Sequence, residues 1–248
     1  MMKQYGLIGF PLSHSFSKKY FDNKFEKEHI KDASFYLWEL EDITQLQSLL
    51  YANNLIHGIA VTIPYKKKVV PFLDWLDPIV QNTGACNCIK IVNNKLYGYN
   101  TDILGFKISF EKHLSPQHRK ALILGSGGAS AGIEYVLNLL NIDYLLVSRQ
   151  KDLRDNSITY CDITPDTMNE YPIIINCTPS GTFPNVDTCP KLPYQSMTAS
   201  NYLFDLVYNP TETLFLKQGK ERGAITQSGY EMLVVQAEEN WRIWNSPV

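Results

Sequence analysis

A glycine-rich turn after a short apolar run is the feature that most constrains how this chain can fold. The run is Ala121–Leu124, and Gly125-Ser126-Gly127-Gly128-Ala129-Ser130 follows at once. This pattern predicts a buried strand, a tight turn and then a helix. Glycines let the backbone approach a pyrophosphate, and the free N–H groups at a helix N-terminus favour an anion. An ordinary glycine-rich turn is the alternative, because Ser130 occupies the place of the third glycine.

The end of the next predicted strand indicates which dinucleotide would fit. The strand is Tyr144–Val147, and Ser148-Arg149-Gln150-Lys151 follows it. Sites for NAD commonly place Asp or Glu here, to accept from the ribose 2′-hydroxyl. In this chain the guanidinium of Arg149 matches a 2′-phosphate in charge and geometry instead. The sequence therefore favours NADP, with an ordinary surface arginine as the alternative.

Strand and helix patterns alternate along the chain and predict an α/β protein of two domains. The first domain, residues 1–102, begins as a βαβαβ unit with a mainly parallel sheet and ends with a hairpin at Asn93-Asn94. The second, residues 103–229, repeats the alternation as a Rossmann-type domain. A last helix within residues 230–248 has an apolar stripe broad enough to pack between the domains. Further helices are expected over residues 16–30, 43–53 and 104–113.

Composition and charge limit the classes of partner. A chain of 248 residues can bury one large core or two modest ones. Its net charge of −2 and pI near 6.2 provide no positive field for nucleic acid. No apolar run approaches the roughly 18 residues of a membrane span, and Tyr5–Phe10 is too short for a signal-peptide core. We therefore expect a cytoplasmic protein with a small-molecule partner, and neither a nucleic-acid nor a membrane partner.

The cysteines predict neither a disulfide framework nor a metal site. There are five, an odd number, without C-x-x-C spacing. Cys86 and Cys88 alternate along a predicted strand, so we expect both sulfurs on one face, as buried apolar filler. Free thiols and no bound metal are the expected outcome.

Polar side chains gather where strands of the first domain are predicted to end. The segment from Gly9 to Ser17 carries several hydroxyl groups at a helix start, which suit either a polyhydroxylated carboxylate or a simple helix cap. The segment Val61–Lys66 places a hydroxyl and an ammonium at the sheet edge where α/β proteins bind ligands. Asn87 and the run Asn100-Thr101-Asp102 add amide and carboxylate groups.

Seven motifs in one order resemble those of the shikimate dehydrogenase family along nearly the whole chain. The motifs are G-x-P-L-x-H-S-x-S from Gly9, V-T-I-P-x-K from Val61, G-A-x-N from Gly84, N-T-D-x-x-G from Asn100, G-S-G-G-A-S from Gly125, N-x-T-P-x-G from Asn176 and G-x-x-M-L-V-x-Q from Gly229. The chain departs from the family where Ala60 replaces a frequent Asn, and where Ser148 and Gln150 flank Arg149 in place of Asn and Thr.

The resemblance implies a role for each matching residue. It implies that the last helix, within residues 230–248, packs back onto the first domain, and it implies Lys66 and Asp102 as the catalytic pair. The implied substrate-binding residues are Ser15, Ser17, Thr62, Asn87, Tyr208 and Gln236. The implied cofactor-binding residues are Gly125, Gly127, Gly128, Ala129, Ser130, Arg149, Thr178, Leu206 and Gly229.

The activity implied by the resemblance is the reversible, NADPH-dependent reduction of 3-dehydroshikimate to shikimate by a monomer or homodimer. Lys66 as an ammonium would donate the proton or stabilise the oxyanion, and Asp102 would hydrogen-bond a ring hydroxyl. The sequence does not decide which of the two moves the proton. Alternatives are the same chemistry on quinate or an amino-substituted shikimate, and a non-catalytic NADP-binding sensor.

Overall fold

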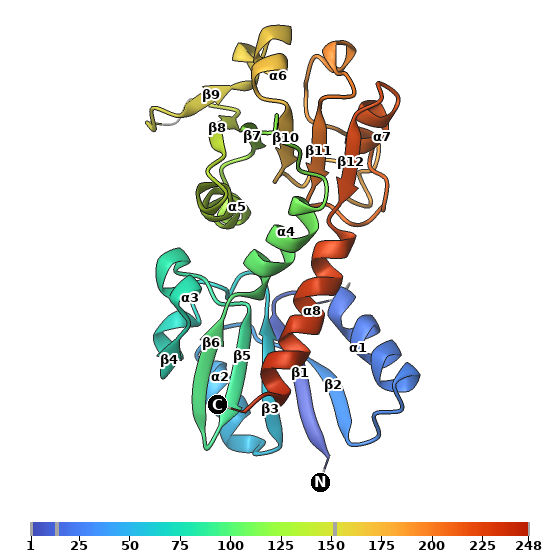
Figure 1. Ribbon diagram of the computed structural model, residues 1–248. Coiled ribbons are helices and arrows are strands. Elements are labelled where there is room, and N and C mark those ends of the chain that lie inside the picture. Colours follow the sequence, from blue (N-terminus) through green and yellow to red (C-terminus); the bar gives the residue numbers. More distant parts are fainter. Residues whose placement is uncertain (1, 13–14, 151–152, 248) are drawn as a thin grey trace. The chain divides into compact units, whose positions relative to one another are not determined.

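The computed structural model describes residues 2–12, 15–150 and 153–247 and divides the chain into two compact units (Figure 1). Unit 1 comprises Met1–Asp102 and Gln236–Val248, and unit 2 comprises Ile103–Val235. Each unit contains a six-stranded sheet, so the predicted α/β class with two sheets is confirmed. The boundaries fall at the start of one helix, α4 (Thr101–Glu111), and within another, α8 (Tyr230–Asn245).

The sheet of unit 1 is mixed, with strand order β2-β1-β3-β5-β6-β4. Strands β2, β1 and β3 run parallel to one another, whereas β5 and β6 form an antiparallel hairpin beside β3. The predicted hairpin is confirmed, since Asn93 and Asn94 adopt the positive φ of 51° and 60° that its two-residue turn requires. The strands are β1 (Lys3–Gly9), β2 (Ala33–Glu39), β3 (Ile56–Val61), β4 (Trp75–Leu76), β5 (Cys88–Val92) and β6 (Lys95–Tyr99).

The two helices predicted for the first domain are shorter than their apolar spacing predicts. They are α1 (Phe16–Lys27) and α2 (Gln45–Ala52), and a further helix, α3 (Pro78–Thr83), was not predicted. Helix α1 ends before the predicted residue 30 because His29 adopts a left-handed φ of 55°. The N–H of Ile30 then donates back to the carbonyl of Phe25, as in a Schellman-type end. Ile30 still packs against the core, so its spacing looked helical although the helix had ended.

Two hydrophobic clusters form the core of unit 1. One is mainly aliphatic and includes Ile8, Ile59 and Ile89, which are fully buried. The other is rich in aromatic rings and includes Tyr5 and Trp244, whose rings stack with centroids 5.1 Å apart. A Cβ at Gly58 would lie 2.3 Å from the Trp244 ring, so the end of α8 can pack here only over a glycine.

The two neighbouring cysteines contradict the expectation that their sulfurs share one face. Cys86 packs in the aliphatic cluster and Cys88 in the aromatic cluster. Cys86 precedes β5, which begins at Cys88, so strand alternation does not govern its direction. Both are buried free thiols, as expected, and burial raises the pKa of Cys86 to about 12.

Unit 2 has a fully parallel sheet in the order β12-β11-β10-β7-β8-β9. Numbered within the unit, this is the Rossmann order 3-2-1-4-5-6 read from β9, and the order reverses between β7 and β10. A crevice for a nucleotide is expected beyond the carboxyl ends of these two strands. The strands are β7 (Lys120–Leu124), β8 (Asp143–Ser148), β9 (Ser157–Thr159), β10 (Ile173–Asn176), β11 (Tyr202–Asp205) and β12 (Ile225–Ser228).

Helices cover the sheet of unit 2. They are α4, α5 (Gly128–Leu139), α6 (Pro165–Glu170) and α7 (Leu214–Lys220). Helix α4 begins before the predicted residue 104, at Thr101, and buries Phe106 and Phe110 against aromatic residues of β11. In the part of the chain that the structure describes, no helix is long and apolar enough to cross a bilayer.

Candidate functional site

A lysine and an aspartate of unit 1 form an ion pair at one edge of its sheet. Lys66 lies after β3 and Asp102 lies in the first turn of α4, just after β6. Because β3 and β6 point the same way, both residues lie at the same edge. The Nζ of Lys66 donates to Oδ2 of Asp102 at 2.6 Å. Their side chains remain 37% and 22% exposed, so a ligand can reach the pair.

Asn87 enters the same edge from the start of β5 and belongs to a buried amide network. Its Oδ1 accepts from the N–H of Thr101 at 2.7 Å, which holds the residue next to Asp102 in place. Its Nδ2 donates to Oγ1 of Thr101 at 3.0 Å and to Oε1 of Gln236 at 3.4 Å. The structure thus brings two of the predicted substrate-binding residues, Asn87 and Gln236, into contact.

The network contains a residue that the sequence did not single out. Asn240 lies one turn after Gln236 in α8 and is 1% exposed. Its Oδ1 accepts from the hydroxyl of Thr101 at 2.7 Å, and its Nδ2 donates to Oε1 of Gln236 at 3.3 Å. The spacing of four residues between two amides on one helix was the signal that could have identified it.

The predicted hydroxyl residues lie at the same sheet edge. Ser15 caps α1, because its Oγ accepts from the N–H of Lys18 at 3.3 Å. The helix-cap alternative is therefore correct for Ser15, although its own O–H can still donate to a ligand. Ser17 lies in the first turn of α1, and Thr62 directly follows β3. Ser13 and His14 of the same motif lie outside the described residues.

Asn100 supports the loop that carries Asn87. The side chain is buried, and its Nδ2 donates to the carbonyl of Ala85 at 3.0 Å. Its Oδ1 is buried without a hydrogen-bond partner among the described residues. The polar run around Asp102 thus contains one residue that positions the loop, one that joins the amide network and one that forms the ion pair.

In unit 2 the glycine turn lies at the reversal of strand order, at the carboxyl end of β7. Gly125 has φ 100°, and a Cβ there would lie 3.0 Å from Thr178, which follows β10. A Cβ at Gly127 or Gly128 would meet nothing within 4 Å, and Ala129 is exposed. The backbone at the start of α5 therefore faces open space.

Three polar side chains around this turn are bonded to the protein itself. Ser130 is buried, and its hydroxyl donates to the carbonyl of Gly127 at 2.7 Å. Thr178 donates from its hydroxyl to Oδ1 of Asn176 at 2.6 Å. Asn176 in turn donates from Nδ2 to Oδ1 of Asp205 at 2.9 Å. The first bond shapes the turn after β7, and the other two shape the loop after β10 and tie it to the end of β11.

Asp205 is a fully buried carboxylate that sequence reasoning also missed. Besides Asn176, the N–H of Val207 and the hydroxyl of Thr213 donate to it, at 3.0 and 2.5 Å. Burial raises the pKa of Asp205 from 3.8 to about 6, although each of these donors lowers it. The group therefore anchors the loop after β11, which carries Leu206 and Tyr208. A Cβ at Gly229 would lie 2.4 Å from the carbonyl oxygen of Leu206, so the chain after β12 also closes on this loop.

Arg149 is exposed directly after β8, where the sequence predicts contact with a 2′-phosphate. Arg154, a second guanidinium nearby in sequence, lies 3.4 Å from the carboxylate of Glu134. Tyr208 is half-buried, and burial raises the pKa of its phenol. It belongs to unit 2, whereas the other predicted substrate-binding residues belong to unit 1.

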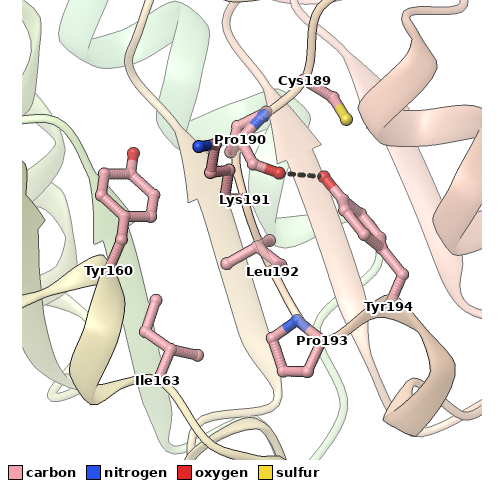
Figure 2. A pocket seen from close by; sticks show the side chains of 8 residues that line it. All are labelled: Tyr160, Ile163, Cys189, Pro190, Lys191, Leu192, Pro193 and Tyr194. Carbon is pink, nitrogen blue, oxygen red and sulfur yellow. Dashed lines mark hydrogen bonds between the residues drawn. The ribbon is translucent and has the colours of Figure 1, made fainter.

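A pocket of about 430 Å³ lies elsewhere in unit 2, and Figure 2 shows the side chains that line it. Tyr160 and Ile163 form one side, and the segment from Cys189 to Tyr194 forms the other. The hydroxyl of Tyr194 donates to the carbonyl of Pro190 at 2.8 Å and closes this segment. The pocket contains none of the predicted site residues.

The fold and the site define a class of two-unit α/β proteins, in which a Rossmann-type unit is joined to a second unit with a lysine–carboxylate pair. A family model for the shikimate dehydrogenase substrate binding domain matches residues 7–89. The NADP(+)-dependent shikimate dehydrogenase of Clostridium beijerinckii is 39% identical, over 98% of this chain and 92% of that protein. That of Desulforamulus reducens is 31% identical, over 98% and 91%.

A solved structure agrees along the same length. The shikimate 5-dehydrogenase of Thermus thermophilus, crystallised with NADP(H) and shikimate, is 26% identical with a TM-score of 0.84. The match covers 100% of this chain and 95% of that one. The chain belongs to the shikimate dehydrogenase family, and the resemblance of the seven motifs is confirmed.

Proposed function

We propose that the protein catalyses the reversible NADPH-dependent reduction of 3-dehydroshikimate to shikimate. The observation that carries this proposal is the ion pair of Lys66 and Asp102, which is open to a ligand at the sheet edge beside Asn87. Membership of the family indicates which substrate and which cofactor the protein uses. A sensor that only binds NADP has no chemical need for this pair, so the geometry favours the enzyme.

In the proposed mechanism the bound cofactor supplies the hydride, and the chain provides orientation and the proton. The ammonium of Lys66 donates a proton to the oxygen of the carbonyl that becomes the hydroxyl. Asp102, 2.6 Å away, orients this ammonium and accepts from a neighbouring ring hydroxyl. Asn87 and Gln236 bind further hydroxyls, while Ser15 and Ser17 donate to the carboxylate and Thr62 contributes another hydroxyl to the substrate.

The division of labour between the units is part of the proposal. Unit 1 would bind the hydroxy acid, and unit 2 would bind NADP. The open space at Gly127 and Gly128 supports a pyrophosphate at the N-terminus of α5. The exposed guanidinium of Arg149 supports contact with the 2′-phosphate. Loops after β10, β11 and β12 would contribute Thr178, Leu206 and Gly229.

The proposal is tested by incubating the purified protein with shikimate or quinate and with each oxidised cofactor. Absorbance of the reduced nicotinamide measures the rate. We expect the highest kcat/KM with shikimate and NADP. A higher value with quinate would favour the quinate alternative. Binding of NADP without turnover of either acid would favour the sensor and contradict the proposed function.

A further inference from the structure

Helix α8 places two amide side chains against the candidate substrate site, and only one of them matches a family motif. Gln236 and Asn240 are 7% and 1% exposed and lie one turn apart. Gln236 contacts Asn87, and Asn240 contacts Thr101, both of which lie at the sheet edge of the same unit. A buried amide of this kind needs a partner for each polar end, so its bonds can be followed from one group to the next.

The backbone N–H of Thr101 fixes the orientation of the Asn87 amide, because this group can only donate. It donates to Oδ1 of Asn87, so the Nδ2 of Asn87 must point to the hydroxyl of Thr101. That hydroxyl accepts this bond, and its own proton has two acceptors within reach, Oδ1 of Asn240 at 2.7 Å and Oδ1 of Asn87 at 3.2 Å. We assign the proton to Asn240, which is nearer, because Oδ1 of Asn87 already accepts from the N–H of Thr101. The Nδ2 of Asn240 is then left to donate to Oε1 of Gln236.

The amide of Gln236 is oriented as a result. Its Oε1 accepts from Nδ2 of Asn240 at 3.3 Å and from Nδ2 of Asn87 at 3.4 Å. The nitrogen of the same planar amide therefore lies on the side away from these two donors. An N–H group on that side can donate to an oxygen but cannot accept from a hydroxyl.

We propose that Asn240 is a positioning residue that sets Gln236 to donate, and not to accept, when it meets the substrate. The ligand atom selected by this arrangement is an acceptor oxygen of the hydroxy acid. The inference rests on the proposed function, in that Gln236 must contact the substrate. Asn240 itself contacts only protein groups in the network.

The variant Asn240→Asp tests the orientation because it keeps the shape but removes the donor. The new carboxylate still accepts from Thr101, and its second oxygen faces Oε1 of Gln236. Two acceptors repel, so the amide of Gln236 turns and presents its oxygen to the substrate. Losing one donated bond and opposing two acceptors is expected to raise the shikimate KM roughly 5- to 100-fold. We expect kcat and the KM for NADP to change less than about twofold.

A double-mutant cycle separates this role from a merely structural one. Gln236→Ala alone should raise the shikimate KM, and adding Asn240→Asp should then raise it no further. Asn245→Asp on the exposed part of α8 is the matched control for charge and should leave KM unchanged. If the buried charge of Asn240→Asp prevents folding, Asn240→Ala can be used instead. It removes the donor to Gln236 without placing an acceptor opposite Oε1, so the amide is no longer held but is not turned over. That variant should give a smaller rise in KM that also disappears in the Gln236→Ala background.

Two results would overturn the inference. One is a shikimate KM equal to that of the wild type in both Asn240→Asp and Asn240→Ala, each shown to be folded. The other is that Asn240→Asp raises the shikimate KM by the same factor in the Gln236→Ala background as in the wild type. An unchanged shikimate KM in Gln236→Ala would show that Gln236 does not contact the substrate, and this inference would then be wrong. Turnover of shikimate by that variant would still support the proposed function. Absence of turnover in the wild type would instead contradict the proposed function itself.

Discussion

The candidate sites of the two units use polar side chains in opposite ways. In unit 1 the side chains themselves face the proposed ligand, as with the solvent-open pair of Lys66 and Asp102. In unit 2 the backbone faces open space at Gly127, while the surrounding polar side chains bond to the protein. Ser130 bonds to the turn, and Asp205 bonds to three neighbouring groups.

This difference follows from what each unit has to recognise. A ring with several hydroxyls presents distinct donors and acceptors, which distinct side chains can match. A pyrophosphate presents only acceptors, for which a helix N-terminus already supplies donors. Removing one side chain should therefore impair chemistry or binding in unit 1. Around the glycine turn of unit 2, removing a side chain should alter the scaffold, and adding atoms to the turn should impair binding. The exposed Arg149 is the exception in this unit, because its guanidinium is proposed to contact the 2′-phosphate.

The largest effect is expected for Lys66→Ala. This variant removes the proposed proton donor, and a positioned acid or base contributes about 10²- to 10⁴-fold to the rate. We expect kcat to fall by this factor, while the shikimate KM and the melting temperature change little. Steady-state kinetics with saturating NADP measure both constants, and Lys67→Ala at the exposed neighbouring position is the control. A normal kcat with a raised KM would make Lys66 a binding residue and contradict the mechanism.

A scaffold effect of about 3 kcal/mol is expected at Asp205. Burial raises the pKa of Asp205 from 3.8 to about 6 in the folded state. Its contribution to the free energy of unfolding is therefore fully present below pH 3.8 and is lost as the pH rises through about 6. A pKa shift of about two units corresponds to about 3 kcal/mol. Asp205→Asn keeps one acceptor oxygen and does not titrate.

Urea unfolding at a series of pH values measures this linkage. We expect the free energy of unfolding of the variant, relative to the wild type, to increase as the pH is raised from about 4 to about 7. Asp205→Ala should be less stable at every pH, because Asn176 and Thr213 lose their acceptor. Parallel pH curves for the wild type and Asp205→Asn would show that this carboxyl does not titrate in the expected range.

A smaller effect is expected from adding atoms to the glycine turn. Gly127 has φ −81°, which any residue adopts, and a Cβ there meets no protein atom within 4 Å. Gly127→Val should therefore fold normally but occupy the space of the pyrophosphate, raising the NADP KM roughly 10- to 100-fold through one or two lost contacts. Gly125→Ala should instead lower the melting temperature, because φ is 100° there. An unchanged NADP KM in Gly127→Val would place the pyrophosphate elsewhere.

Features that depend on adjacent residues were predictable from the sequence. The hairpin needs only two residues that tolerate positive φ, which Asn93 and Asn94 supply. The strand, turn and helix around Gly125 likewise depend on a short segment. The end of α1 was not predictable from spacing, because Ile30 returns to the same core after the left-handed residue His29.

The parts of the site that were missed depend on contacts between distant residues. Thr101 and Asn240 are 139 positions apart, and Asn87 and Gln236 are 149 apart. Asn240 looks like one more polar residue of a helix until the fold brings Thr101 beside it. Cys86 likewise needed the observed start of β5 before its direction could be assigned.

The smallest effects are expected at Ser15 and Ser17, where the comparison between the units is least clear. The Oγ of Ser15 accepts from the N–H of Lys18 at 3.3 Å, so this side chain serves the scaffold and can also donate to a ligand. Ser15→Ala should cost about 1 kcal/mol of helix capping, or about 2–4 °C in melting temperature. Ser17 does not cap the helix, so Ser17→Ala should keep the melting temperature. Each variant should raise the shikimate KM about 5- to 10-fold by removing one donor to the carboxylate. Ser48→Ala, at an exposed position of α2, is the control and should change neither quantity. An unchanged shikimate KM in both variants, with a lower melting temperature in Ser15→Ala alone, would show that these hydroxyls do not bind the substrate and that Ser15 only caps the helix.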